Sequence, residues 1–467
     1  MAEKFEIWGV KDPNISAQLA LAMNLDLFKR EAGLDIACKF IESGTTMPGD
    51  ILNAEKKPFA FIQTPITAIL LHEKGLSVKI LAPLADIAGS QQVIVRAASA
   101  ISAPHDLRGK RLGMAKGAAV YIAIMNMAKD CDVDIEDVYF INLLPQAQLD
   151  AFADGKLDAL ACWEPWTTKA QALGGQFYFS GSRSAIPGLE GDVSWLINQT
   201  CLMTPDAHLE QAPEVLLAIL RVLREATNLI NLGFREVLDI LAAFFEISLE
   251  ALTAIMHKNT YSMTMDNLFR IGVLSFRDFL HETGRLSRQL SEEDLYTPQF
   301  LAQVDSFLVT LRDKTGQRAN MIAKDGIYYR ENTVFEGDTS QLRFLLVDDS
   351  RVVRSFLNQM LVILGGQAIG EAMTGNEAIS MFANLRPNFV TMDLSMPGLS
   401  GVDAIRRILQ IDPHVNIIVI SGLNLEEVRE EVFNLGAKMY LPKPFNPERA
   451  ATVIRSLLNQ SEAVRNA

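Results

Sequence analysis

The sequence predicts an α/β protein, and three observations support that prediction. Short strand-like runs alternate with helical patterns from the N-terminus, as they do in proteins built on mostly parallel sheets. With 467 residues the chain is too long for one ordinary core, so two or three domains are expected. A second series of alternating elements begins at "RFLLVDD", residues 343–349.

The first series starts at the N-terminus and is followed by a helical region. Apolar periodicity predicts strands at 4–10, 34–43, 58–63, 78–85 and 91–97, and helices at 15–33 and 118–130. Gly33 is expected to end the first of these helices, because glycine readily adopts the left-handed backbone conformation. From Thr204 to about Leu311 the pattern is helical, with clear examples at 213–233 and 234–246.

A polar stretch separates the two series. Residues 312–341 are charged and show no apolar period, so we expect a connector in which "GIYY" (326–329) packs on a neighbour. The second series then runs to about Leu458. The expected divisions are therefore 1–311, a connector at 312–341, and 342–467.

Composition excludes several classes of function. The net charge is −13 and no Lys/Arg-rich run offsets it, so nucleic-acid binding is not expected. The four cysteines lie far apart and are expected to be reduced thiols. The N-terminal "MAEKFEIWGVKDPN" has no apolar signal region, and no run reaches the roughly 18–20 apolar residues that span a bilayer. A cytoplasmic protein without membrane insertion is expected.

Polar residues follow four predicted strands of the second series. Asp348 and Asp349 end "FLLVDD", Asp393 ends "NFVTMD", Ser421 ends "NIIVIS" and Lys443 ends "MYLPK". In a doubly wound parallel sheet, ligands bind beyond the carboxyl ends of the strands. We therefore expect these five side chains to converge on one crevice.

These residue types suit phosphoryl chemistry. Three neighbouring carboxylates repel one another unless a cation neutralises them, and Mg²⁺ prefers such oxygen ligands. An ionised aspartate can act as a nucleophile toward phosphorus, and Lys443 could pair with the incoming phosphoryl oxygens.

Residues 343–460, which hold these strand-end residues in this order, resemble the receiver domain of bacterial response regulators. The resemblance implies a flavodoxin-like doubly wound (βα)₅ fold in which Asp393 accepts a phosphoryl group from a histidine kinase. It further implies Mg²⁺ bound by Asp348, Asp349, Asp393 and the backbone carbonyl of Ser395.

The same resemblance assigns roles to four further residues. Ser421 and Lys443 would contact the phosphoryl group, Tyr440 would be the aromatic switch residue, and the peptide bond before Pro444 would be cis. The alternative is a degenerate receiver that keeps the fold and has lost the chemistry.

The first series resembles the substrate-binding proteins of nitrate, sulfonate, taurine and thiamine-pyrimidine importers. The similar pieces include "LFKREAGLDI", "FAFIQTPITAILLHEKG", "DLRGKRLGMAKGAAVYIA" and "QAQLDAFADGKLDALACWEPW", in that order over about 300 residues. The resemblance implies a two-lobed, periplasmic-binding-protein-type clamshell. Lobe 1 would comprise about 1–95 and 201–311, lobe 2 about 96–200, and the cleft between them would hold a small anion or heterocycle.

The cleft residues are expected on loops after the strands. The free N–H groups of the helix that opens after Gly117 could bind an anion. The indoles of "ACWEPW" (161–166) are expected near the pocket mouth, and packing between the lobes is the alternative. For the polar loop residues, a role in a local turn or helix cap is an equal alternative to ligand binding. The candidate ligand-binding residues are Trp8, Ser43, Gly44, Thr45, Gln63, Thr64, Gly117, Ala118, Trp163, Glu164 and Trp166.

Together the two resemblances imply a two-component signalling protein, not an enzyme, in which a ligand-binding clamshell is coupled to phosphorylation of Asp393. A downstream protein partner is expected at the face near Tyr440. Two alternatives stay open: a phospho-switched interaction module whose clamshell no longer binds ligand, and an enzyme like the thiamine-pyrimidine synthases. The second is disfavoured, because neither a cysteine-rich stretch nor an acid–base pair stands out in the first 311 residues.

Overall fold

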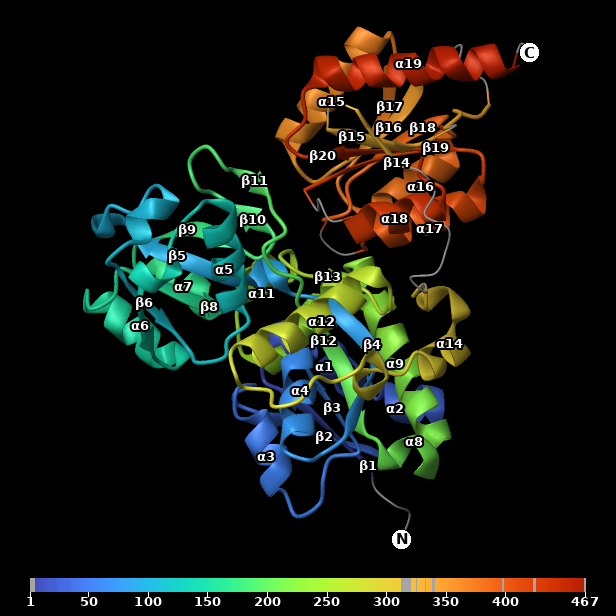
Figure 1. Ribbon diagram of the computed structural model, residues 1–467. Helices are drawn as coiled ribbons and strands as arrows, with labels where there is room; N and C mark the ends of the chain where they lie inside the picture. Colours follow the sequence, from blue (N-terminus) through green and yellow to red (C-terminus); the bar gives the residue numbers. More distant parts are fainter. Residues whose placement is uncertain are drawn as a thin grey trace. The chain divides into compact units, whose positions relative to one another are not determined.

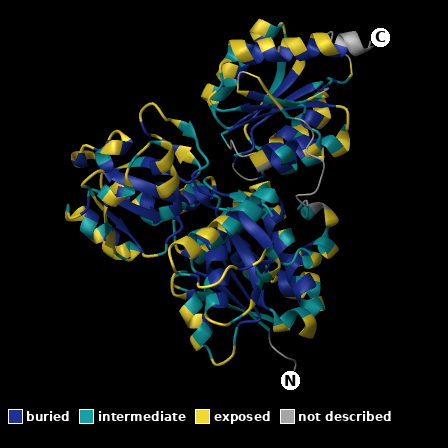
Figure 2. Ribbon diagram, viewed as in Figure 1, coloured by how far each residue is buried: buried dark blue, intermediate teal, exposed yellow. Residues whose placement is uncertain are grey.

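The computed structural model divides the chain into two compact units. The first comprises Met1–Glu190 and Trp195–Leu311, and the second comprises Gly191–Ser194 and Arg312–Ala467. The structure describes residues 5–311, 321–324, 326–331, 333–337, 341–396, 399–422 and 426–465. In both units the strands form the buried interior and the helices carry the exposed faces (Figure 2).

The first sheet of the first unit is mixed. Its strand order is β13-β4-β12-β3-β1-β2, in which β1 runs parallel to β2 and β3 while β12 runs antiparallel to β3 and β4. The strands are β1 (Phe5–Val10), β2 (Ile36–Ile41), β3 (Ala60–Gln63), β4 (Val78–Asp86), β12 (Gln199–Pro205) and β13 (Thr260–Tyr261).

The second sheet of this unit has the order β11-β10-β9-β5-β8-β6-β7, with β5 antiparallel to both β8 and β9. Its strands are β5 (Gln91–Arg96), β6 (Arg111–Met114), β7 (Tyr139–Asn142), β8 (Ala159–Trp163), β9 (Gly175–Ser180), β10 (Arg183–Ser184) and the two-residue edge strand β11 (Gly191–Asp192). Because all of β5 belongs here, the chain changes sheets at about 87–90, earlier than the expected residue 95. Periodicity marks a strand but not the sheet that it joins.

Helices surround both sheets. They are α1 (Pro13–Asn24), α2 (Leu27–Ala32), α3 (Met47–Asn53), α4 (Pro65–Glu73), α5 (Val120–Asp130), α6 (Pro145–Ala153), α7 (Trp166–Ala172), α8 (Ala207–Gln211), α9 (Pro213–Leu232), α10 (Arg235–Phe245), α11 (Leu249–Met256), α12 (Asn267–Glu282), α13 (Glu292–Leu295) and α14 (Gln299–Val304). The helix expected at 15–33 is in fact two. Asp26 has a φ of +53°, a left-handed conformation that interrupts the α-helical path, and Gly33 ends α2 with a φ of +65°.

The second unit is built on one largely parallel sheet. Its strand order is β14-β15-β20-β19-β18-β16-β17, and Figure 1 shows α15 and α19 on one face and α16, α17 and α18 on the other. The strands are β14 (Met321–Lys324), β15 (Ile327–Arg330), β16 (Arg343–Val347), β17 (Gln367–Ala372), β18 (Phe389–Met392), β19 (Asn416–Ser421) and β20 (Met439–Pro442). The helices are α15 (Arg351–Leu364), α16 (Gly375–Leu385), α17 (Gly401–Ile411), α18 (Glu426–Leu435) and α19 (Pro447–Arg465).

Part of the segment expected to be a connector belongs to this sheet. Strands β14 and β15 pair as an antiparallel hairpin, and Tyr328 of β15 pairs with Tyr440 of β20. Phe335 is fully buried in the core of the unit. The polar composition of the segment concealed the hairpin, because a hairpin at the edge of a sheet needs only one apolar face. The Asp-Gly pair at 325–326 is the local sequence signal for a hairpin.

Candidate functional site

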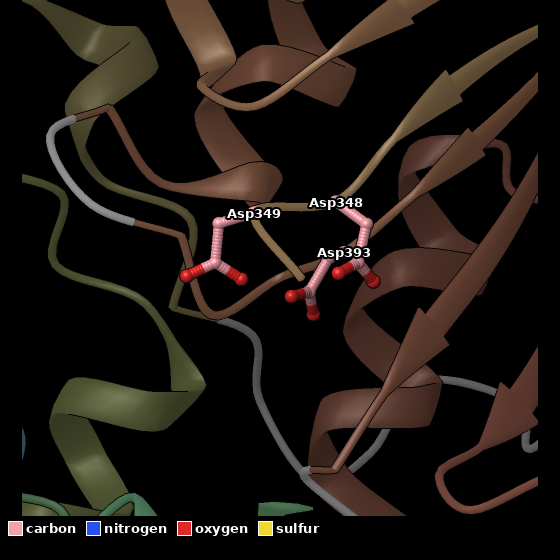
Figure 3. A group of neighbouring side chains, drawn as sticks. All are labelled: Asp348, Asp349 and Asp393. Atoms are coloured by element: carbon pink, nitrogen blue, oxygen red, sulfur yellow. The ribbon is translucent and has the colours of Figure 1, made fainter. Parts of the chain in front are cut away.

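Three carboxylates gather at the carboxyl end of the receiver-like sheet. Asp348 follows β16 and Asp393 follows β18, and the Asp393 N–H donates to the Val347 carbonyl at 2.9 Å, which holds the two strand ends together. Oxygens of Asp348, Asp349 and Asp393 lie within 4.8 Å of one another (Figure 3). The parallel sheet thus brings together residues 45 positions apart in the chain, as the strand-end pattern predicts.

Lys443, which follows β20, faces these acids. Its Nζ lies 2.9 Å from Oδ2 of Asp348 and 2.9 Å from Oδ2 of Asp393, and its side chain is only 6% exposed. The expected cis peptide before Pro444 is present. An ammonium in this position can neutralise negative charge on a group attached to Asp393.

Burial dominates the electrostatics of the cluster. It raises the pKa of Asp393 to about 7; the Lys443 ammonium opposes this shift and the Asp348 charge adds to it. Burial also raises the pKa of Asp348. Burial alone would lower the pKa of Lys443, but attraction to the surrounding carboxylates, Asp393 foremost, raises it well above its usual value.

The donor set fits a hard divalent cation. Oδ2 of Asp348 is buried and makes no hydrogen bond of good geometry, although Lys443 is near it. One lysine cannot balance three carboxylates, and oxygen ligands of this kind are those that Mg²⁺ prefers. Ser395 lies beside the cluster, because its N–H donates to Oδ1 of Asp393 at 3.2 Å.

Ser421 and Tyr440 lie on the neighbouring strands, and both are fully buried. Burial raises the pKa of the Tyr440 hydroxyl, and a hydrogen bond with Ser421 opposes that shift. The two hydroxyls are therefore linked beside Asp393. All the receiver residues that the sequence singled out come together at this edge of the sheet.

The first unit contains a pocket of about 140 Å³. One water molecule needs roughly 10–15 Å³ of such a cavity, so the pocket has room for about ten groups of the size of a water molecule. Seven of the candidate ligand-binding residues line it: Gly44, Thr45, Gln63, Thr64, Gly117, Ala118 and Trp163.

Four other candidates are engaged elsewhere. Trp8 is 3% exposed within β1 and lies under the Lys39 ammonium, and the Ser43 hydroxyl bonds to Thr45. Glu164 is fully buried in an ion pair with Lys258. Trp163 and Trp166 both pack against the core of their lobe, but of the two only Trp163 also lines the pocket.

Two cations that the sequence did not single out line the same pocket. Lys116 precedes Gly117, and Arg285 follows α12; within the described chain neither side chain has a hydrogen bond or ion pair. The Arg285 guanidinium nitrogens lie 2.8 and 2.9 Å from where a Cβ on Gly117 would be, so Arg285 covers the turn that opens α5. The pocket therefore offers positive charge at a helix N-terminus.

A buried amide in the pocket lacks a partner. Asn198 is 1% exposed, and neither its Nδ2 nor its Oδ1 has a hydrogen-bond partner among the described residues. Leaving such a group unsatisfied costs roughly 1–3 kcal/mol, so a ligand or water must be expected there. Asp12, which caps α1, also lines the pocket, and burial raises the pKa of its carboxyl to about 6.

Two protein-family models match the chain. Residues 344–455 match the response regulator receiver domain, and residues 15–231 match the family described as NMT1/THI5 like. Within the described residues, no helix is both long and apolar enough to cross a bilayer.

Relatives of the C-terminal region include chemotaxis proteins. The chemotaxis protein CheY of Thermotoga maritima is 37% identical over 115 residues, which are 25% of this chain and 96% of the relative. CheY of Bacillus subtilis is 33% identical over 117 residues and is covered to 98%.

Solved structures similar to the first unit include sulfonate-binding proteins. The periplasmic aliphatic sulphonate binding protein SsuA of Escherichia coli has a TM-score of 0.54 and 15% identity, covering 64% of this chain and 93% of that one. A sulfonate-binding protein from Methylobacillus flagellatus has a TM-score of 0.53 and 14% identity, covering 67% and 98%. At these identities the likeness shows the fold, a periplasmic-binding-protein-like clamshell.

Proposed function

Because the chain belongs to the response regulator receiver family through its C-terminal region, we propose that it is a two-component signalling protein in which a histidine kinase phosphorylates Asp393 and the first unit binds a small anion. The observation that supports the phosphorylation most directly is the convergence of Asp348, Asp349 and Asp393 on the Lys443 ammonium.

The chemistry follows from these side chains. An ionised carboxylate oxygen of Asp393 attacks phosphorus; an acyl-phosphate P–O bond forms as the bond from phosphorus to the donor breaks, and the donor leaves with that electron pair. Lys443, 2.9 Å from Asp393, pairs with the charge that arrives. Asp348, Asp349, Asp393 and the carbonyl of Ser395 would hold Mg²⁺, which when bound supplies positive charge to the phosphoryl oxygens.

The unoccupied hydrogen-bonding capacity of the pocket supports ligand binding by the first unit. Arg285 and Lys116 supply positive charge, the start of α5 supplies free N–H groups, and Asn198 supplies an unsatisfied amide. A cavity of about 140 Å³ favours a binding role over that of a closed interaction module. We assign binding and no catalysis to this unit, since its described lining residues include no cysteine or histidine. We also propose a cytoplasmic setting, because kinases that draw phosphate from ATP work there.

Labelling by acetyl phosphate with Mg²⁺ tests the phosphorylation. The full chain should gain one phosphoryl group by intact mass, and Asp393→Asn should gain none while its circular dichroism stays unchanged. Asp412→Asn, which removes an acid at the end of α17, is the matched control and should label normally. Undiminished labelling of the Asp393→Asn protein would place the acceptor elsewhere and refute the proposal.

A further inference from the structure

Two buried amide side chains in the pocket of the first unit have unused hydrogen-bonding capacity. Asn198, which directly precedes β12, is 1% exposed, and neither its Nδ2 nor its Oδ1 is satisfied within the described chain. Gln91, the first residue of β5, is 5% exposed, and its side chain makes no hydrogen bond there either. Folded proteins pair nearly all of their buried polar groups, so these two amides point to a ligand that completes them.

Other polar side chains of the same pocket are paired. The Gln63 side-chain carbonyl accepts a hydrogen bond from the Thr64 N–H at 2.8 Å. The Asn14 amide donates to Asp12 at 2.8 Å and to the Glu164 carbonyl at 2.9 Å. The two unpaired amides are therefore not a general feature of the pocket wall.

A simple anion cannot satisfy Asn198. Ionised carboxylate and sulfonate groups only accept hydrogen bonds, so they can take the N–H groups of Nδ2 but leave Oδ1 without a donor. A buried acceptor in that state still carries its desolvation cost. The group that completes Asn198 must therefore offer a donor and an acceptor side by side, as a carboxamide does.

The surroundings of Gln91 favour a flat group of this kind. Gln91 on β5 is the cross-strand partner of Trp163 on β8, and both line the pocket. Directly paired residues of neighbouring strands project on the same face of the sheet. An indole gives a planar carboxamide an apolar surface, and a neighbouring amide supplies hydrogen bonds to its edge.

We propose that Asn198 and Gln91 form a carboxamide subsite, so that the ligand of the first unit is a small anion that also carries a carboxamide group. The inference rests on the proposed anion binding and adds the chemical class of the ligand. The anionic group meets Lys116 and Arg285, which line the same pocket. The carboxamide donates to Oδ1 of Asn198 and accepts from its Nδ2, which leaves neither atom unsatisfied.

Matched pairs of ligands test the subsite in the unaltered full chain. Succinamate and glutaramate each carry a carboxylate and a carboxamide, whereas the methyl ketones of the same length keep the shape, the charge and the carbonyl acceptor but lack the N–H donors. With about eight or nine non-hydrogen atoms, these molecules match a pocket of about 140 Å³. In calorimetry each amide should bind about tenfold more tightly than its ketone, because the ketone leaves Oδ1 of Asn198 without a donor.

A pair of variants separates ligand recognition from packing. Asn198→Leu removes both polar atoms and keeps a side chain of similar size, so it should abolish the preference for amides over ketones. The melting temperature of the ligand-free variant should not fall, because the lost amide has no partner in the described chain. Gln148→Leu is the matched control, since Gln148 is fully buried away from the pocket and donates to the Leu143 carbonyl at 2.9 Å. This control should keep the preference and lower the melting temperature.

Different results overturn the subsite and the proposed function. If the parental chain binds small anions without preferring amides, or if Asn198→Leu keeps the preference, the subsite is refuted and anion binding stands. A clearly lower melting temperature of the ligand-free Asn198→Leu protein would also refute it, because Asn198 would then serve packing. If no amide, ketone or sulfonate binds, the proposed ligand binding itself fails.

Discussion

At the scale of single residues, burial decides how each acid behaves. Asp12 caps α1 through a bond from the Asn14 N–H at 2.8 Å, yet it also lines the pocket. Burial raises the pKa of this carboxyl to about 6, and its hydrogen bonds with Asn14 only partly oppose the shift. An acid that changes charge near neutral pH therefore lines the same pocket as Lys116 and Arg285.

We predict that anion affinity of the first unit falls as the pH rises through about 6. Below that pH Asp12 is neutral; above it the carboxylate repels the anion, and a bound anion in turn raises the pKa of Asp12. If the bound anion raises the pKa of Asp12 by about one unit, the anion binds about tenfold more weakly at pH 7.5 than at pH 5. Calorimetry with a series of small sulfonates and carboxylates measures it.

Asp12→Asn should remove this pH dependence, because asparagine keeps the helix cap but carries no charge. Asp50→Asn, an exposed acid in α3, should leave it intact. An affinity that instead increases with pH would mean that the ligand presents a positive group to Asp12.

At the scale of elements, the hairpin β14–β15 makes the second unit larger than its sequence pattern suggests. Tyr328 packs under the Arg429 guanidinium at 4.1 Å, so β15 contacts α18 as well as β20. Phe335 reaches the core and stacks edge-on against Phe389. The hairpin β14–β15 and Phe335 are thus part of the folded second unit rather than a spacer, and β15 pairs with β20, the strand that carries Tyr440.

Phe335→Ala should lower the free energy of unfolding of the second unit by about 3–5 kcal/mol, the usual cost of removing a buried phenylalanine. Ile322→Ala, at an exposed position of β14, should change it by less than about 1 kcal/mol. Calorimetry of the full chain separates the transitions of the two units. Equal effects of the two substitutions would show that Phe335 is not part of the core.

At the scale of the whole molecule, one chain joins the pocket of the first unit to the carboxylate cluster of the second. The pocket includes Ala119, the residue that precedes α5; at the other end of α5, Asp130 accepts a hydrogen bond from the Trp195 indole at 2.8 Å. A ligand that contacts the start of α5 therefore acts on a helix that anchors Trp195 within the first unit.

We predict that phosphorylation changes the anion affinity of the first unit about fivefold or more. Calorimetry should give different dissociation constants for the chain before and after treatment with acetyl phosphate and Mg²⁺. The treated Asp393→Asn protein should behave as untreated. A dissociation constant unaffected by phosphorylation would mean that the two units work independently.

Local pattern was sufficient for much of the fold. Each strand and helix depends on neighbours in sequence, so the strand at 4–10, the end of α2 at Gly33 and the cap of α16 at Thr374 all follow from it. The helical break at Asp26 did not, because a left-handed aspartate is a rare conformation that tertiary packing selects.

By itself the sequence determined the receiver site of this protein, because Asp348, Asp393, Ser421 and Lys443 each end a strand and parallel strands must end at one edge. Only the tertiary structure decided which loops meet elsewhere: that Arg285 covers Gly117, and that Trp163 rather than Trp166 faces the pocket. The physical reason is that these contacts join residues far apart in the chain and on irregular backbone, where no periodic rule relates position in sequence to position in space.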